Sequence, residues 1–181
     1  MSHWSPTELS RDCTATTVPY GERVALTAGG LVEIVQRLGG SITVRTEMGS
    51  LMRIDGADAD ALGLEPLDDA GERAAAGPFE IEHVIDALQG IYDPEIPVSI
   101  VELGLVYRCE EINNADGTRR IEIDMSMTAP GCGMGDILRA DALRAAQAVP
   151  GVDDVDVTLV WDPPWSVHRM SDAARLQLGM L

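Results

Sequence analysis

The stretch IEIDMSMTAPGCGMGDILRADALRAAQAVPGVDDVDVTLVW, residues 121–161, decides the fold of the second half of the chain. Apolar and polar residues alternate from Ile121 to Met127 and again from Val155 to Trp161, which predicts two half-buried strands. Between them, apolar residues recur at helical spacing from Leu138 to Val149, and the Pro-Gly pair that follows ends the helix. A strand–helix–strand unit predicts that the two strands lie parallel, joined by a right-handed crossover.

The residues before this stretch add a helix and a third strand. From Ile81 to Ile91 the apolar residues follow the i, i+3, i+4, i+7 rule of an amphipathic helix, and Pro94 is expected to stop it. Leu105–Ile112 has the composition of a strand, and Asn113–Gly117 is a hairpin loop signal. We therefore expect helix–strand–strand–helix–strand with a mixed three-stranded sheet, then a tail whose short helix is capped by Ser171.

Residues 16 to 62 favour β structure, because short runs rich in Val, Ile, Leu and Thr are separated by glycines. The runs are Arg23–Thr27, Leu31–Leu38, Ser41–Thr46 and Met48–Ile54. Residues 63–79 are rich in Pro, Gly, Ala and Asp, a composition typical of a linker. The prediction is an α+β protein with a small β-rich N-terminal extension (1–62), a linker (63–79) and a second domain with a C-terminal tail (80–181).

The charge of the chain excludes several function classes. It has 30 acidic residues against 13 basic ones, a formal net charge of −17, and every basic residue is Arg. Without Lys there can be no Schiff base and no P-loop lysine. Nucleic acid and anionic membrane surfaces are poor partners for so acidic a chain.

The sequence favours the cytoplasm. The longest run without a charged residue, Met125–Gly135, has 11 residues, whereas a membrane span needs about 20. The first six residues lack the basic and apolar segments of a secretory signal. Cys13, Cys109 and Cys132 are odd in number and far apart, so we expect no disulfide framework. Three thiols are also too few for a closed four-thiolate metal site in one chain.

The loop from Thr128 to Gly135 is the first candidate site. It follows a predicted strand and precedes a predicted helix, where open α/β sheets place their ligands. Glycines let backbone N–H groups approach a bound group, and a thiol near a helix N-terminus tends towards the thiolate, the form that binds metals and attacks electrophiles. Cys132 is therefore a candidate functional thiol. The alternative is a small residue in a tight turn.

Three carboxylates and a second thiol are weaker candidates. Asp93 and Glu95 flank Pro94, and Glu102 interrupts an apolar stretch, where burial requires a partner or a cation. The alternative is that each caps backbone N–H groups or faces solvent. Cys13 is either a second thiol for a shared ligand or a packing residue, and Cys109, inside a strand, is expected to pack in the core.

Four motifs in a fixed order carry a family resemblance: Asp93–Pro97 (DPEIP), Glu102–Tyr107 (ELGLVY), Thr128–Gly133 (TAPGCG) and Trp161–Trp165 (WDPPW). They resemble the metal–sulfur cluster assembly domain that PaaD-type proteins, cytosolic iron–sulfur targeting factors and SufT share. The N-terminal half looks like the SufT-specific extension, on the strength of the segments RDC (11–13), VPYG (18–21), QRLGGS (36–41) with Thr43-Val44, and GADADALG (56–63).

The resemblance implies a non-enzymatic auxiliary factor in iron–sulfur cluster maturation by the SUF system. It places the reactive cysteine at Cys132 and the motif's acidic positions at Asp93, Glu95 and Glu102, with the supporting loop residues Thr128, Gly131 and Gly133. Asp136 adds a negative charge at the helix start, which would oppose thiolate formation if it pointed inward. The cargo implied is iron or an iron–sulfur cluster, held transiently and not firmly bound.

The partners implied are SUF assembly proteins and client iron–sulfur apoproteins, with no nucleic acid and no membrane. Because one thiolate per chain cannot hold a stable cluster, further ligands must come from a partner or from a second copy in a homodimer. Two other functions remain open. One is a thiol-dependent enzyme with Cys132 as nucleophile, for which no general base can be assigned. The other is an adaptor that only docks proteins.

Overall fold

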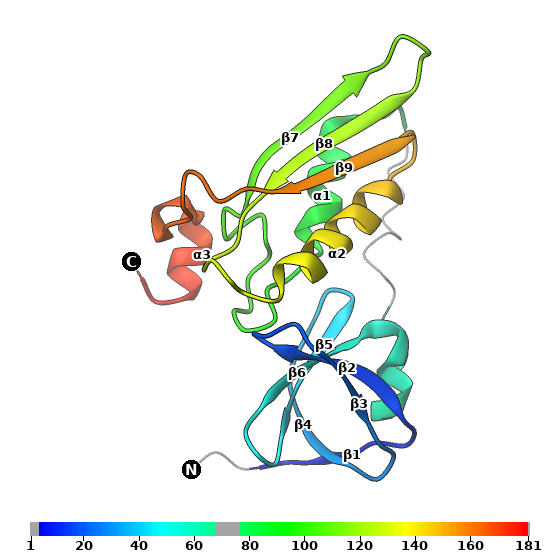
Figure 1. The fold of residues 1–181 in the computed structure, drawn as a ribbon, viewed down its shortest axis with the longest axis vertical. Coiled ribbons are helices and arrows are strands. Elements are labelled where there is room, and N and C mark those ends of the chain that lie inside the picture. Colours follow the sequence, from blue (N-terminus) through cyan, green and yellow to red (C-terminus); the bar gives the residue numbers. More distant parts are fainter. Residues whose placement is uncertain (1–3, 68–76, 181) are drawn as a thin grey trace.

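The computed structural model of the protein describes residues 4–67 and 77–180. Two sheets, one from each half of the chain, lie one beyond the other along the long axis of the molecule (Figure 1). Within the described ranges, no helix is long and apolar enough to cross a membrane.

The N-terminal sheet has six strands in the order β1-β4-β5-β6-β2-β3, and every neighbouring pair is antiparallel. The strands are Thr7–Glu8 (β1), Cys13–Val18 (β2), Arg23–Leu26 (β3), Leu31–Leu38 (β4), Ser41–Thr46 (β5) and Leu51–Asp55 (β6). The sheet curls around its own core, which includes Leu9, Ala15, Val32, Ile42, Val44 and Ile54. The 3-10 helix η1, Gly56–Leu62, packs on this core through Ala59, Ala61 and Leu62.

The predicted β-rich half is confirmed, and β4 and β5 have the predicted bounds. Two details differ. β2 begins at Cys13, before the predicted β region, because Cys13 and Ala15 alternate with exposed residues and fill the core. Met48 does not belong to a strand: it lies in the turn before β6, and its side chain is 93% exposed.

The second half has the predicted order of elements. α1 (Ile81–Gln89) is followed by β7 (Val106–Asn113), β8 (Arg119–Met125), α2 (Gly135–Gln147) and β9 (Asp154–Leu159), and the tail holds η3 (Val167–Arg169) and α3 (Asp172–Gln177). β7 pairs antiparallel with β8, and β8 pairs parallel with β9, so the mixed three-stranded sheet is confirmed. Ser171 caps α3 as expected, accepting a hydrogen bond of 3.0 Å from the backbone N–H of Ala174.

Several boundaries of the second half were predicted wrongly. β8 ends at Met125 and α2 at Gln147, so Met127 and Val149 lie outside these elements. α1 ends at Gln89, because Gly90 follows it, and does not continue to Pro94. Trp161 lies outside β9 and is 46% exposed. The chain leaves the sheet after Val160, whose N–H still bonds to the carbonyl of Met125, because two prolines follow that cannot donate to a ladder.

The described residues form two hydrophobic clusters, one in each half. The second cluster, around α1, α2 and the three-stranded sheet, contains from the N-terminal half only Val18 and, partly buried, Leu51 among the described residues. In the predicted linker, Leu64 and Leu67 pack on the first cluster and Phe79 packs on the second, while residues 68–76 lie outside the described residues. The independence of the two halves as domains stays a prediction.

Candidate functional site

The loop between β8 and α2 is held from both sides. The N–H of Ser126 bonds to the carbonyl of Leu105, and Met127 and Met134 are buried in the second cluster. The N–H of Gly135, at the start of α2, bonds to the carbonyl of Cys132 at 3.3 Å. Because its neighbours are anchored in this way, the loop is held in place. Cys132 is half-buried in this loop.

The thiol of Cys132 faces the N-terminal sheet. Its Sγ donates to the carbonyl oxygen of Pro19 at 3.7 Å, in the turn between β2 and β3. The two backbones touch at a pair of glycines: a Cβ on Gly133 would lie 1.7 Å from the carbonyl oxygen of Tyr20, and a Cβ on Gly21 would lie 2.1 Å from that of Gly133. Sequence reasoning missed this contact. The glycines were its only signal.

The other loop residues lie towards solvent. Gly131 is exposed with φ of 78°, and Thr128 is half-buried. The side chain of Asp136 is 84% exposed, and its Oδ1 lies 3.7 Å from Arg139 Nε, so its carboxylate faces solvent.

Asp93 and Glu95 occupy a separate loop after α1. Asp93 is buried, and its Oδ1 accepts hydrogen bonds of 2.9 Å from the backbone N–H groups of Glu95 and Ile96. Burial raises the pKa of this carboxyl, although the two hydrogen bonds act in the opposite direction. Glu95 is exposed. The carboxylate of Asp93 therefore stabilises the turn that follows it.

Glu102 contacts the C-terminal tail. Its carboxylate accepts a hydrogen bond from the hydroxyl of Ser171, and its backbone carbonyl accepts the N–H of the same residue at 2.9 Å. Glu102 also lines a groove with Leu38 and Gln177, away from the Cys132 loop. The carboxylate thus has a partner at the start of α3.

The other two thiols lie in apolar surroundings. Cys13 is buried in the first cluster, and burial raises its pKa, with nearby Asp58 acting in the same direction. Val18 lies five positions after Cys13, about 16 Å further along the extended strand β2. The turn that contacts Cys132 begins after Val18. Cys109 packs against the second cluster, and burial raises the pKa of its thiol to about 11.

The structure does not gather the candidate residues into one closed site. Among residues 4–67 and 77–180 there is no group of three or more His, Cys, Asp or Glu side chains that could hold a metal ion. A metal ligand role for Cys132, Asp93, Glu95 or Glu102 stays a prediction.

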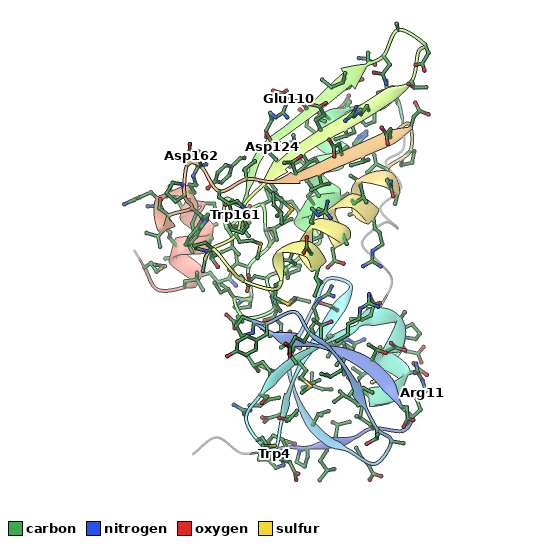
Figure 2. All side chains as sticks on the ribbon, viewed as in Figure 1. Trp4, Arg11, Glu110, Asp124, Trp161 and Asp162 are labelled. Atoms are coloured by element: carbon green, nitrogen blue, oxygen red, sulfur yellow. The ribbon has the colours of Figure 1, made fainter. Side chains whose placement is uncertain are left out.

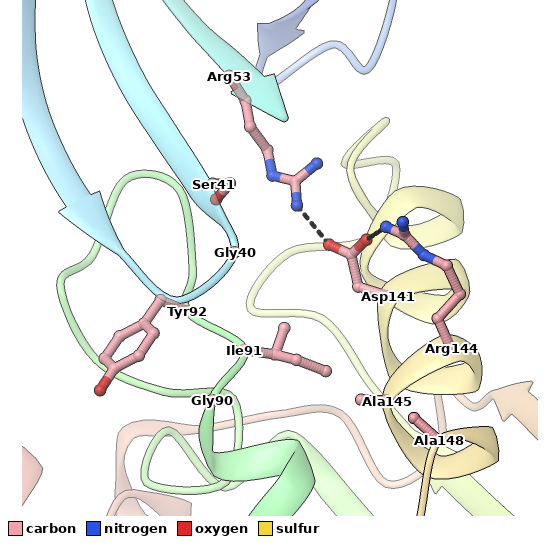
Figure 3. A pocket seen from close by; sticks show the side chains of 10 residues that line it. All are labelled: Gly40, Ser41, Arg53, Gly90, Ile91, Tyr92, Asp141, Arg144, Ala145 and Ala148. Carbon is pink, nitrogen blue, oxygen red and sulfur yellow. Dashed lines mark hydrogen bonds and ion pairs between the residues drawn. The ribbon is translucent and has the colours of Figure 1, made fainter. Parts of the chain in front are cut away.

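A cavity of about 90 Å³ lies between the N-terminal sheet and α2 (Figure 3). Arg53 Nη2 lies 2.6 Å from Asp141 Oδ2, and Arg144 binds the other oxygen of this carboxylate. The side chains of Arg53 and Asp141 are only 10% and 9% exposed. Ile91 and Ala145 contribute the apolar wall. No predicted site residue lines the cavity, and its ion pair connects the two halves of the molecule.

Comparison with known proteins assigns the second half to a family. A family model described as "Iron-sulfur cluster assembly protein" matches residues 81–159. An Fe-S protein maturation auxiliary factor of Porphyromonas gingivalis is 37% identical over 100 residues, which cover 55% of this chain and 91% of that protein. The Fe-S protein maturation auxiliary factor SufT of Staphylococcus aureus is 36% identical over 90 residues, which cover 50% of this chain and 98% of that protein.

A solved structure supports the same assignment. The crystal structure of a domain of unknown function from Bacillus anthracis matches with a TM-score of 0.50 and 37% identity, and the match covers 55% of this chain and 92% of that one. Sequence similarity, matched length and fold therefore agree over the half of the molecule that carries the β8–α2 loop. The chain belongs to the iron–sulfur cluster assembly protein family.

Proposed function

We propose that this protein is a non-enzymatic auxiliary factor in iron–sulfur cluster maturation, in which Cys132 is a transient ligand of iron or of a cluster. The position of the thiol carries the proposal: it lies in an anchored, surface loop between β8 and α2, inside the matched residues 81–159. The relatives' names, maturation auxiliary factors, support the same function. Iron or the cluster is the cargo in this account.

A single available thiol suits a factor that passes its cargo on. Cys13 and Cys109 lie in apolar surroundings and have raised pKa values, so neither offers a ready thiolate beside Cys132. The remaining ligands of a cluster then come from a second copy of the chain, an assembly protein or a client. Weak retention by one thiolate favours release to a client that supplies more ligands.

The carboxylates have a secondary place in the proposal. Asp93 and Glu102 already have hydrogen-bond partners, and the exposed Glu95 lies in the Asp93 loop. Any of them that binds iron would do so as a hard oxygen ligand, separately from the soft thiolate of Cys132. SUF assembly proteins and iron–sulfur apoproteins are the proposed partners, in the cytoplasm.

Anaerobic reconstitution tests the proposal. The full chain, its Cys132→Ser variant and a Cys109→Ala control are incubated with ferrous iron and sulfide, and bound iron and sulfide per chain are measured by equilibrium dialysis, which does not strip weakly held cargo. We expect the wild type and the Cys109→Ala control to retain both, and Cys132→Ser to retain neither. Equal retention by wild type and Cys132→Ser would remove Cys132 from the proposal.

A further inference from the structure

The N-terminal sheet contacts two of the loops that carry predicted site residues. The turn between β2 and β3 lies on the Cys132 loop. Gln36 and Thr43, in β4 and β5, donate hydrogen bonds of 3.0 Å and 3.1 Å to the carbonyl oxygens of Asp93 and Pro94. Figures 1 and 2 show the sheet against the end of the second half where α2 begins. One element therefore touches both loops.

The contact at Cys132 has no room for a side chain. Gly133 brings its backbone against Tyr20, and Gly21 against Gly133, closely enough that a Cβ on either glycine would overlap a carbonyl oxygen. The Cys132 thiol beside this contact uses its hydrogen on Pro19.

We propose that the N-terminal sheet covers the Cys132 loop. The Pro19–Gly21 turn of this sheet must move away before Cys132 binds iron or a cluster. On withdrawal, a metal can reach Sγ; an S–metal bond then replaces the S–H bond, and the proton passes to solvent. The inference rests on the proposed function and adds its regulation: the turn limits access to the Cys132 thiol, spontaneous opening gives slow access, and a partner that displaces the sheet gives full access.

The shorter relatives support a separate, added cover. The match leaves 9% of the Porphyromonas gingivalis protein and 2% of the Staphylococcus aureus protein outside it, whereas about half of this chain is unmatched. The family model begins at residue 81, after the whole of the N-terminal sheet. The relatives thus have no room for a six-stranded sheet of their own on this face.

The contacts between the halves are mostly polar, so opening them exposes little of either core. Among the described residues they include backbone contacts at Gly21–Gly133 and Gly39–Gly90, the hydrogen bonds from Gln36 and Thr43, and the Arg53–Asp141 ion pair, with Val18 and Leu51 as apolar contacts. Polar interfaces of this kind permit relative motion of the parts they join. When they separate, Asp141 keeps its bond to Arg144, so no buried carboxylate is left unpaired.

Alkylation of Cys132 by iodoacetamide, followed by mass spectrometry of the full chain, tests the cover. Gly21→Ala pushes the turn away from Gly133, so Cys132 should react at least about fivefold faster, as expected for loss of one hydrogen-bonded contact. Gly49→Ala is the matched control, because Gly49 is also a turn glycine of the same sheet with positive φ (83° against 76°), yet an added Cβ there meets nothing within 4 Å. It should leave the Cys132 rate at the wild-type value.

A second variant approaches the contact from the other side. Gly133→Ala places its Cβ against Tyr20, and Gly133 has no positive φ, so it displaces the turn without backbone strain of its own. Slow alkylation of Cys13 and Cys109 in each variant shows that the cores stay closed. If Cys13 or Cys109 also reacts faster in Gly21→Ala, the test of the cover rests on Gly133→Ala alone. Unchanged Cys132 rates in the variants that keep closed cores would overturn the cover.

The same variants separate the cover from the proposed function when iron and sulfide retention is measured as well. Faster alkylation with no iron retained by any variant keeps the cover and ends the cargo role of Cys132. Iron retention that depends on Cys132, combined with an unchanged alkylation rate in Gly21→Ala and Gly133→Ala, ends the cover and keeps the cargo role.

Discussion

At the scale of single residues, the three thiols differ in their surroundings. Cys13 is buried among the side chains of a curled sheet, Cys109 lies in a strand against the second core, and Cys132 lies half-buried in a surface loop. Reactivity of a thiol requires both exposure and the thiolate form. Cys109 and Cys132 are both half-buried, but burial raises the pKa of the Cys13 and Cys109 thiols, so neither of these forms the thiolate readily.

The order of alkylation in the wild-type chain follows from this difference. With a pKa of about 11, only about one Cys109 in a thousand is thiolate at pH 8. Iodoacetamide should therefore label Cys132 first, and Cys109 and Cys13 at least about tenfold more slowly. Peptide mass spectrometry of samples quenched at intervals measures the three rates. Equal rates at Cys132 and Cys109 in folded protein would contradict the assignment of Cys132 as the available thiol.

Asp93 makes stability depend on pH in a direction opposite to the usual carboxylate. Because burial raises its pKa, the native state holds this proton more tightly than the unfolded chain does. The free energy of unfolding then falls as the pH rises from the ordinary Asp value of about 3.9 through the raised native pKa. Asp93→Asn keeps an oxygen for the N–H groups of Glu95 and Ile96 but cannot ionise. It should remove this contribution, so its unfolding free energy relative to the wild type should rise between pH 4 and pH 7 in urea unfolding; a difference that does not change with pH would contradict the account.

At the scale of elements, the sequence predicts the second half best. Alternation in Ile121–Met127 and Val155–Leu159 and the apolar stripe of α2 identify the strand–helix–strand unit, because each element buries one face against its neighbours. The ends of helices and strands were less predictable: α1 ends at Gln89, with Gly90 as its C-cap, and does not reach Pro94. We interpreted the glycines of the Cys132 loop as positions where a ligand can approach the backbone. At Gly133 it is the carbonyl of Tyr20 that approaches the backbone. This contact joins residues distant in sequence, so local patterns do not predict it.

Glu102 was predicted to be paired or bound to a cation, and the structure pairs it with Ser171 at the start of α3. Glu102→Gln keeps an oxygen that accepts from Ser171, so the tail should stay docked and the fold intact. If Glu102 is also an iron ligand, the variant should bind ferrous iron at least about tenfold more weakly in anaerobic titrations.

Ser171→Ala is the matched control for this titration. It removes the same hydrogen bond from the opposite side and costs α3 its cap, about 1 kcal/mol, while the Glu102 carboxylate remains. Iron binding should survive in Ser171→Ala. Identical titration curves for wild type and Glu102→Gln would restrict Glu102 to its contact with the tail.

At the scale of the whole molecule, the second half contains almost all of its own core. Only Val18 and Leu51, of the described N-terminal residues, reach into that cluster, and Phe79 packs there with the guanidinium of Arg119 4.1 Å from its ring centre. A fragment of residues 77–181 should therefore fold, with a cooperative thermal transition in circular dichroism. A fragment of residues 80–181, which lacks Phe79, should lose about 2 kcal/mol of unfolding free energy. An unstructured 77–181 fragment would show that the two halves form one continuous folding unit.

The central claim is that this protein supports iron–sulfur maturation through the thiol of Cys132. Its most direct test is complementation of a strain that lacks the protein, measured as the activity of a [4Fe–4S] enzyme per amount of that enzyme's polypeptide in anaerobic extracts. The account predicts that the wild type and Cys109→Ala restore this ratio, and that Cys132→Ser, produced at the same level, does not. Restoration by Cys132→Ser to the wild-type ratio would contradict the claim and leave the protein as a docking adaptor.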